Sequence, residues 1–248
     1  MTRLGGKVAL VTGAAGGMGS AIARVLAAHG AAVVIADVRG EKGRSFEAEI
    51  VERGGTATYR HLDVASEAAW IETIAAVEAW RGRLDILINN AGINVRGPIG
   101  TLAFDDFNRV LAVNLGGPLL GMKHAAPAIG RAGGGSIVNI TSNISLIPSR
   151  SAAYAASKWG LRGLAKTAAL EYAPQNIRVN CIGPGVVPTD LNVGQPYLQT
   201  TAGITPLGRI ATAEDIANAV LFLVSDAGAF ITGVDLPVDG GFTLGHAR

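Results

Sequence analysis

The sequence predicts a single α/β domain: a doubly wound parallel sheet of about seven strands with helices on both faces. Three observations lead to this prediction. Short apolar runs alternate along the chain with longer amphipathic ones. Most of the short runs are continuous stretches rich in Val and Ile, which is typical of strands buried on both faces. No linker, low-complexity segment or shift in composition divides the 248 residues, so residues 1–248 are expected to form one domain.

Seven strands are expected from these runs, at residues 8–11, 32–36, 56–59, 86–88, 136–140, 177–182 and 234–238. Helices are expected between them, because apolar residues recur there at helical spacing. The apolar faces are Ile22, Val25 and Leu26; Trp70, Ile71, Ile74 and Val77; and Ile216, Val220, Leu223 and Val224. Such an alternation gives a parallel sheet, in which ligands bind beyond the carboxyl ends of the strands. Functional residues are therefore expected directly after each strand.

Composition and charge argue against several other classes of protein. The net charge is +2 and no block of like charges occurs, so nucleic-acid binding has no electrostatic support. No apolar stretch approaches the ~20 residues of a membrane span and the first residues lack a signal-peptide core, so a soluble cytoplasmic protein is expected. The lone Cys181 excludes an intrachain disulfide, and the four histidines show no metal-ligand spacing, so no metal is expected.

A glycine-rich segment follows the first expected strand and precedes a helix. It reads Thr12-Gly13-Ala14-Ala15-Gly16-Gly17-Met18-Gly19. Small residues allow the backbone to approach a pyrophosphate closely, and the N–H groups at the start of the helix stabilise its negative charge. Gly13, Gly17, Met18 and Gly19 are therefore candidate cofactor-binding residues. A glycine-rich turn without a ligand is the alternative that this segment alone leaves open.

Asp37 ends the second strand, about 20 residues beyond the glycines, where a dinucleotide-binding fold has the carboxylate that binds the adenosine ribose. Its charge would repel a 2′-phosphate, which favours NAD over NADP. N-capping of the next helix is the structural alternative. Arg39 is the counter-evidence, because an arginine near this pocket is able to pair with a phosphate.

Further candidate cofactor residues follow the third and fourth strands. Asp63, with Val64 beside it, is able to accept a hydrogen bond from an adenine amino group. Asn90, Ala91 and Gly92 are able to contact the cofactor or to hold the turn. Isolated Asn and Asp residues in loops are more often turn formers.

Tyr154 and Lys158 form the candidate catalytic pair. They lie four positions apart in a helical segment and therefore share one face. A tyrosine with an ordinary pKa near 10 is a poor base at neutral pH, but a neighbouring ammonium lowers that pKa. Ser142 follows the fifth strand and is able to hold a substrate oxygen. Each also has an ordinary alternative: a solvated Tyr–Lys pair, or a serine that caps a strand end.

Taken together and in this order, the motifs resemble the short-chain dehydrogenase/reductase family over essentially the whole chain. The matching residues are Thr12, Gly13, Gly17, Gly19, Asn89-Asn90-Ala91-Gly92, Asn114, Ser142, Tyr154, Lys158, Pro184, Gly185, Thr189 and Asp239-Gly240-Gly241. The resemblance implies a Rossmann-type fold, a nicotinamide cofactor and hydride exchange with a CH–OH group. It implies that Tyr154 is the general acid/base, that Lys158 also binds the nicotinamide ribose, and that Asn114 holds a water near the lysine. The Ser142-to-Tyr154 interval is one residue shorter than the commonest spacing in the family, so Ser145 is the alternative catalytic serine.

The resemblance also implies a segment beside the nicotinamide, and the composition of the residues that follow predicts a substrate lid. The residues expected beside the cofactor at this end are Tyr154, Lys158, Pro184, Gly185, Val187 and Thr189. Residues 189–206 are irregular and are expected to form the lid. The candidate substrate residues are Ser142, Ile144, Val186, Leu191 and Tyr197. Because most of them are apolar, the expected partner is a small hydrophobic ketone or secondary alcohol.

Three functions remain open at this point. The first, which Asp37 favours, is an NAD(H)-dependent dehydrogenase of hydrophobic secondary alcohols, similar to bacterial hydroxysteroid dehydrogenases. The second, which Arg39 favours, is an NADPH-dependent ketoreductase similar to 3-oxoacyl reductases. The third is a non-catalytic dinucleotide-binding protein, and the presence of both Tyr154 and Lys158 argues against it. The resemblance further implies a homotetramer built partly from the helix that follows Ser151.

Overall fold

The computed structural model describes residues 4–189 and 197–245. Within these residues seven strands form one parallel sheet, in the order β3-β2-β1-β4-β5-β6-β7. The strands are β1 (Val8–Thr12), β2 (Ala32–Asp37), β3 (Thr56–His61), β4 (Ile86–Asn89), β5 (Gly135–Ile140), β6 (Ile177–Pro184) and β7 (Asp235–Val238). Each overlaps one of the expected runs, so the predicted doubly wound α/β fold is confirmed.

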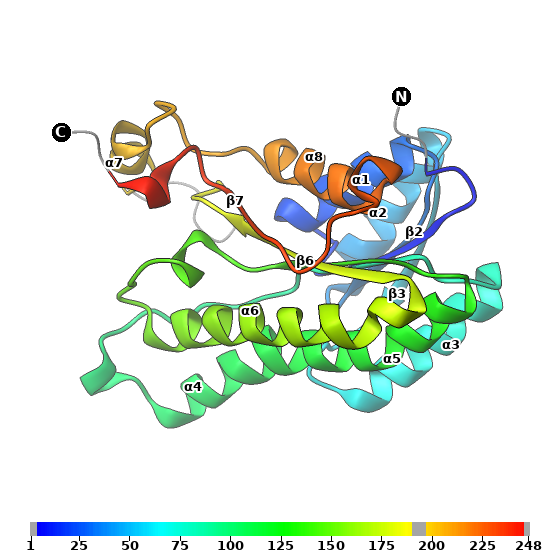
Figure 1. Cartoon of the computed structure of the whole chain (residues 1–248), viewed down its shortest axis with the longest axis horizontal. Coiled ribbons are helices and arrows are strands. Elements are labelled where there is room, and N and C mark those ends of the chain that lie inside the picture. Colours follow the sequence, from blue (N-terminus) through cyan, green and yellow to red (C-terminus); the bar gives the residue numbers. More distant parts are fainter. Residues whose placement is uncertain (1–3, 190–196, 246–248) are drawn as a thin grey trace.

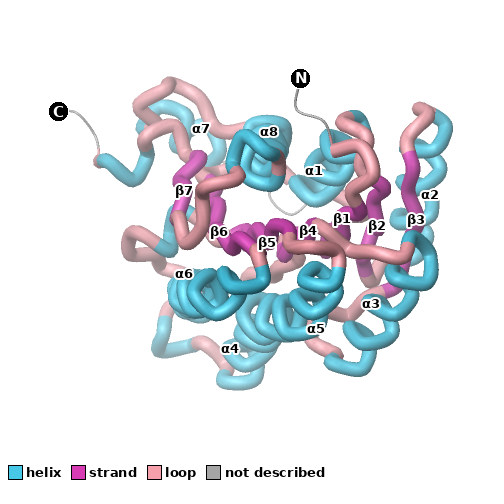
Figure 2. Tube along the Cα trace, turned by 45° about the vertical axis from the view of Figure 1, so that its right-hand side comes forward, coloured by secondary structure: helices cyan, strands magenta, loops and turns pink. Residues whose placement is uncertain are grey.

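Helices cover both faces of the sheet, which forms the middle layer in Figure 2. On one face lie α1 (Gly17–Ala28), α2 (Gly40–Glu52) and α8 (Ala213–Val224). On the other lie α3 (Glu67–Arg81), α5 (Gly117–Arg131) and α6 (Ala152–Tyr172). Two further helices are α4 (Phe104–Leu111), which packs beneath α6, and α7 (Tyr197–Ile204), near the C-terminal end of the described chain (Figure 1).

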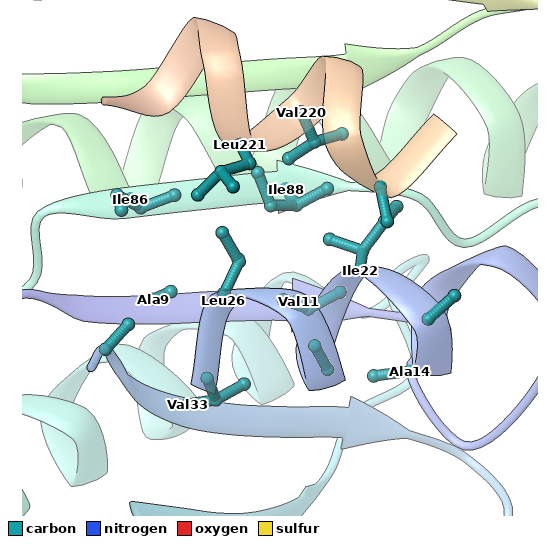
Figure 3. Close-up of a cluster of buried hydrophobic side chains, with 14 of the residues drawn as sticks. Ala9, Val11, Ala14, Ile22, Leu26, Val33, Ile86, Ile88, Val220 and Leu221 are labelled. Carbon is teal, nitrogen blue, oxygen red and sulfur yellow. The ribbon is translucent and has the colours of Figure 1, made fainter. Parts of the chain in front are cut away.

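The apolar faces of α1 and α8 meet over the middle of the sheet (Figure 3). Ile22 and Leu26 of α1 and Val220 of α8 are fully buried against β1 and β4. Burial of each such side chain contributes about 1.5–3 kcal/mol to folding. Val25, expected on the same face, is only partly buried at its edge.

The apolar face predicted for α3 is wrong at one residue. Trp70, Ile74 and Val77 of α3 are buried as predicted, but Ile71 is 53% exposed. Positions 70, 74 and 77 follow the helical repeat, whereas Ile71 lies about 100° around the helix from Trp70. Trp70 also donates its indole N–H to the carbonyl oxygen of Val64 at 3.0 Å, which fixes the orientation of the helix.

The strand order puts β1 between β2 and β4, so the connections after β1 and β4 leave in opposite directions. A crevice for ligands opens at such a point of reversal, outside the carboxyl ends of the strands. Asp37, Asn89, Ile140 and Pro184 are the last residues of β2, β4, β5 and β6. The candidate residues therefore gather along one edge of the sheet.

Two further features of the described chain concern membranes and metals. Within residues 4–189 and 197–245, none of the helices combines the length and the apolar character that a bilayer crossing requires. The same residues contain no group of three His, Cys, Asp or Glu side chains placed to hold a metal ion.

Candidate active site

The glycine loop between β1 and α1 brings backbone into close contact with the segment after β4. Gly13 and Gly17 have φ angles of 62° and 55°, which strain any residue with a Cβ. A Cβ on Gly13 would lie 2.9 Å from the Cα of Ala91, and one on Gly19 would lie 2.6 Å from Nδ2 of Asn90. The loop therefore presents bare backbone at the start of α1, the arrangement that fits a pyrophosphate. The side chain of Met18 is partly buried and packs against the core, which leaves its backbone at the start of α1.

Thr12 joins the glycine loop to the Asn89–Gly92 segment. Its hydroxyl accepts hydrogen bonds from the backbone N–H groups of Asn90 and Ala91, both at 3.0 Å. The side-chain amide of Asn90 returns bonds to the carbonyl oxygens of Thr12 at 2.8 Å and Gly13 at 3.2 Å. Sequence reasoning gave the Thr12 hydroxyl no role. The feature of the sequence that could have indicated this role is a polar residue at the end of an otherwise apolar, buried strand.

Asp37 is 4% exposed and receives several hydrogen bonds. The backbone N–H of Ala15 donates to Oδ2 at 2.9 Å, and the Arg39 guanidinium donates to both carboxylate oxygens at 3.1 Å. Burial acts to raise the pKa of Asp37, but the bonds from Arg39 and Ala15 outweigh it and hold the pKa below its usual value. The arginine that argued for NADP is therefore paired with the carboxylate that argues for NAD.

Asp63 and Val64 hold the turn that leads into α3. Asp63 is exposed, and its Oδ1 accepts a hydrogen bond from the N–H of Ala65 at 3.0 Å. Val64 is buried against Gly117, where a Cβ would lie 2.9 Å from its Cγ2. Asp63 therefore stabilises a turn, which was the alternative to a role in cofactor binding. A contact with adenine stays a prediction.

Tyr154 and Lys158 lie one turn apart on α6, beside the end of β5. The Lys158 ammonium is 5.5 Å from the centroid of the Tyr154 ring and donates a 2.8 Å bond to the carbonyl oxygen of Ile140. A Cβ on Gly92 would lie 3.7 Å from Nζ of Lys158 and 3.3 Å from Oδ1 of Asn114. The segment after β4 therefore reaches the candidate catalytic lysine.

Asn114 lies in a π-helical turn, Ala112–Gly116, that separates α4 from α5. It is fully buried. Its side chain exchanges two 2.8 Å hydrogen bonds with the backbone of Ile93 and donates a third, 3.1 Å bond to Oγ of Ser157. π-Helical turns frequently occur at functional sites. Asn114 ties the segment after β4 to α6, one residue from Lys158.

Burial is the largest influence on the pKa values of the candidate catalytic pair. It raises the pKa of Tyr154, and a hydrogen bond with Ser142 opposes the rise. It lowers the pKa of Lys158 to about 8. The sequence predicted that Lys158 would lower the pKa of Tyr154. In the protein alone the pKa of the tyrosine moves the other way, because burial removes water and this outweighs the opposing effect of Ser142.

The two candidate serines differ in what they contact. Ser142 begins the 3₁₀ turn Asn143–Ser145, where its Oγ accepts a 3.3 Å bond from the N–H of Ile144, and it acts to lower the pKa of Tyr154. Ser145 is 1% exposed, and its hydroxyl donates to the carbonyl oxygen of Ser142 at 2.6 Å. Ser145 is therefore committed to the turn, whereas Ser142 lies beside the tyrosine.

The segment after β6 crosses toward the glycine loop. A Cβ on Gly185 would lie 2.9 Å from the Cα of Asp239, and Val187 is buried. Val186 accepts a 3.0 Å hydrogen bond from the N–H of Ala211 through its carbonyl oxygen. Thr189 ends the described part of this segment, and a Cβ on Gly17 would lie 3.4 Å from its Cγ2. Pro184 through Thr189 thus span from the sheet edge to the start of α1.

The candidate substrate residues are only partly described. Ile144 lies in the 3₁₀ turn beside Ser142 and is partly buried. Tyr197 begins α7, where Arg96 donates a 2.9 Å bond to its hydroxyl and has its guanidinium carbon 4.8 Å from the ring centroid. Leu191 and much of the expected lid lie outside the described residues.

Comparison with known proteins fits this geometry. Residues 13–243 match the family model described as enoyl-(acyl carrier protein) reductase. The chain is 45% identical to trans-4-hydroxycyclohexanecarboxylate dehydrogenase of Sinomonas cyclohexanicum, covering 98% of this chain and 95% of that one. It is 40% identical to 3-alpha-(or 20-beta)-hydroxysteroid dehydrogenase of Mycobacterium tuberculosis, covering 99% and 93%. A solved short-chain type dehydrogenase/reductase from Mycobacterium ulcerans superposes with a TM-score of 0.94 at 33% identity, covering 99% and 92%.

The chain therefore belongs to the short-chain dehydrogenase/reductase family. It is an oxidoreductase that acts on CH–OH groups, and dehydrogenases of this family bind a nicotinamide dinucleotide. The predicted family and enzyme class are confirmed.

Proposed function

We propose that this protein is an NAD(H)-dependent oxidoreductase that interconverts a hydrophobic cyclic secondary alcohol and its ketone, with Tyr154 as general acid/base. The observation that carries the proposal is the arrangement around Tyr154. Ser142 acts to lower the pKa of Tyr154, the tyrosine ring lies 5.5 Å from the Lys158 ammonium, and the glycine loop opens at the same edge of the sheet.

The proposed chemistry follows from these contacts. During oxidation the Tyr154 phenolate removes the hydroxyl proton of the alcohol, while Ser142 Oγ holds the substrate oxygen in place. A bound nicotinamide supplies the two-electron chemistry, accepting the hydrogen of the carbinol carbon together with its electron pair. In the reverse direction the Tyr154 phenol returns its proton to the ketone oxygen. The charged form of Lys158 favours the phenolate, and because its pKa is about 8 the lysine is charged at neutral pH.

Asp37 supports NAD over NADP. Its carboxylate is buried, its pKa is lowered, and it is therefore charged at neutral pH. A second negative charge from a 2′-phosphate would be repelled there, whereas ribose hydroxyls are able to donate to it. Arg39 forms an ion pair with the same carboxylate, and this pairing weakens the argument that Arg39 binds a phosphate.

The substrate class rests on the relatives. Their printed names describe alcohols carried on a cyclohexane ring and on a steroid. Ile144, Val186 and Tyr197, with Leu191 in the lid at residues 189–206, are proposed to contact the ring. The remaining proposed cofactor contacts are Gly13, Gly17, Met18, Gly19, Asp63, Val64, Asn90, Ala91, Gly92, Pro184, Gly185, Val187 and Thr189, and Asn114 completes the proposed catalytic set.

Assembly and location are part of the same proposal. The protein is proposed to act in the cytoplasm as a homotetramer that packs partly through α6. An exposed apolar side chain of this helix, Leu170, supports it, since 81% of its surface faces solvent in the single chain.

The test is a spectrophotometric assay at the nicotinamide absorbance band. Purified protein receives NADH or NADPH with a panel of ketones: cyclohexanone, 4-oxocyclohexanecarboxylate, a 3-oxosteroid and a 3-oxoacyl thioester. Turnover of a cyclic ketone with NADH that disappears in Tyr154→Phe supports the proposal. Turnover with NADPH alone, or only of the thioester, would establish the ketoreductase alternative. Binding of NADH without turnover of any ketone would contradict the proposed substrate class.

A further inference from the structure

Side chains on α6 bind main-chain carbonyl groups on both sides of Ser142. Lys158 donates to Ile140 at 2.8 Å, and the Trp159 indole donates to Ile144 at 2.9 Å. One turn further along the helix, Arg162 Nη1 donates to the carbonyl oxygen of Ser145 at 2.6 Å. Ile140 ends β5, and the other two acceptors belong to the 3₁₀ turn that begins at Ser142. The helix that carries Tyr154 therefore holds the turn that begins at Ser142.

Arg162 is itself held from the far side. Its Nη2 donates to Oδ2 of Asp235 on β7 at 3.0 Å, and its guanidinium carbon lies 5.4 Å from the centroid of the Trp159 ring. The side chains of Arg162 and Asp235 are only 22% and 15% exposed. Lys166 also reaches Asp235, at 2.8 Å, but its other bond goes to the carbonyl oxygen of Gly233.

The bond from Arg162 acts on Ser142 through a short path. Ser145 receives the guanidinium bond on its carbonyl oxygen, and its own hydroxyl donates to the carbonyl oxygen of Ser142 at 2.6 Å. A 3₁₀ turn of three residues has few internal hydrogen bonds, so external donors define its position. A bond with a charged donor is about twice as strong as a neutral one.

We infer that Arg162 is a positioning residue: held by Asp235, it fixes the Ser142 turn and so sets the Ser142 hydroxyl against Tyr154. The inference rests on the proposed function, in which Ser142 and Tyr154 act on the substrate. A planar guanidinium has donors pointing in two directions and is able to bind Ser145 and Asp235 at once. A lysine ammonium in its place is a compact point charge on a flexible stem and would lose this defined geometry.

The test compares Arg162→Ala with Lys166→Ala. Both variants remove a cation from Asp235, but only the first removes the bond to the turn. Arg162→Ala is expected to lower kcat about 10- to 100-fold through misplacement of Ser142. The NADH dissociation constant should stay within about twofold, because the glycine loop is not in this network. Ethylguanidinium is expected to restore part of the lost kcat. Lys166→Ala is expected to retain wild-type kinetics.

A pH profile separates positioning from a general loss of structure. The bond from Ser142 lowers the pKa of Tyr154, so its loss raises that pKa. The rise of kcat with pH in the oxidation direction should therefore move to higher pH in Arg162→Ala, and not in Lys166→Ala. If the pH profile of Arg162→Ala does not move and ethylguanidinium does not restore its kcat, the inference is overturned. An equal loss of kcat in Arg162→Ala and Lys166→Ala would also overturn it. If Arg162→Ala fails to fold, Arg162→Lys decides: a reduced kcat supports the inference and a wild-type kcat overturns it.

Hydrogen exchange provides a readout that needs no turnover. The N–H groups of Ser145 and Leu146 bond within the turn, at 3.0 and 2.9 Å. They should exchange faster in Arg162→Ala or Arg162→Lys than in wild type or Lys166→Ala. Unchanged exchange in the Arg162 variants would overturn the inference, even if no substrate were found. If exchange is faster in these variants but the wild-type protein turns over no substrate, that result counts against the proposed function alone.

Discussion

The Lys158 ammonium donates a 2.8 Å hydrogen bond to the carbonyl oxygen of Ile140, the last residue of β5. The lysine is 3% exposed, and burial lowers its pKa from 10.5 to about 8. Between these two pH values the unfolded chain binds more protons at this group than the folded protein does. Stability attributable to Lys158 therefore rises with pH across this window, and the cost of burying the cation is fully present below about pH 8.

This linkage predicts the behaviour of Lys158→Met. The variant lacks the titrating group, so the wild type should gain up to about 3 kcal/mol relative to it between pH 8 and pH 10.5. Urea unfolding of both proteins at several pH values measures the difference. A difference in unfolding free energy that stays constant with pH would refute the buried, depressed pKa. Activity should fall in the variant, since the proposed cofactor ribose contact and the charge near Tyr154 are both removed.

Gly19→Ala should damage the cofactor site. The new Cβ would collide with the carbonyl oxygen of Gly13 and lie 2.6 Å from Nδ2 of Asn90, so the glycine loop must shift. The cost in stability should be about 1–3 kcal/mol, with a loss of NADH affinity of at least about tenfold. Gly100→Ala is the control, because a Cβ on this exposed residue outside the proposed lid meets nothing within 4 Å. NADH titration by fluorescence, with thermal unfolding, tests both variants, and an equal effect in the two would contradict the role of Gly19.

Asp37→Ser should change the cofactor preference. The ribose hydroxyls lose a charged acceptor, so NADH binding should weaken at least about tenfold. The negative charge that repels a 2′-phosphate is also removed, so NADPH binding should improve. Arg39→Ala keeps the carboxylate and should bind NADH as the wild type does. Titration of the three proteins with both cofactors measures the preference, and retention of NADH selectivity in Asp37→Ser would rule out this role.

Replacement of the two serines separates the alternatives left by the motif spacing. Ser142→Ala should lower kcat about 100-fold or more, since the hydroxyl proposed to hold the substrate oxygen is lost. Ser145→Ala removes a bond within the turn and should cost less. Steady-state kinetics with the preferred ketone compare the variants. A larger loss in Ser145→Ala would transfer the catalytic role to that residue.

Much of the fold was predictable because local and global signals agree. Continuous apolar runs such as residues 8–11 have no polar face to present to water, so they belong inside a parallel sheet. Ile71 was misplaced because an apolar residue adjacent to a buried one looks the same in sequence whether it faces the core or the solvent. Which residues of α3 are buried depends on how the helix packs Trp70 against the sheet.

The site was predictable as a set of residues but not as a set of contacts. Pairing of Arg39 with Asp37, and of Arg162 with Ser145, depends on side-chain conformations and on elements meeting in space. The pKa direction of Tyr154 was also out of reach, because it depends on how much water burial removes rather than on which charge lies nearby. The π-helical turn around Asn114 has no sequence periodicity that would reveal it.

The bonds between Thr12 and Asn90 have a consequence for synthesis of the chain. The two residues are 78 positions apart, and β1 pairs with β4 only after β2, β3 and their helices have been made. Contacts between distant parts of a chain form late, because a large loop must close first. On the ribosome, the first strand and its glycines would emerge long before the segment that holds them in shape. We therefore expect that a nascent chain that ends before residue 90 does not bind a dinucleotide, although its glycine motif is already complete.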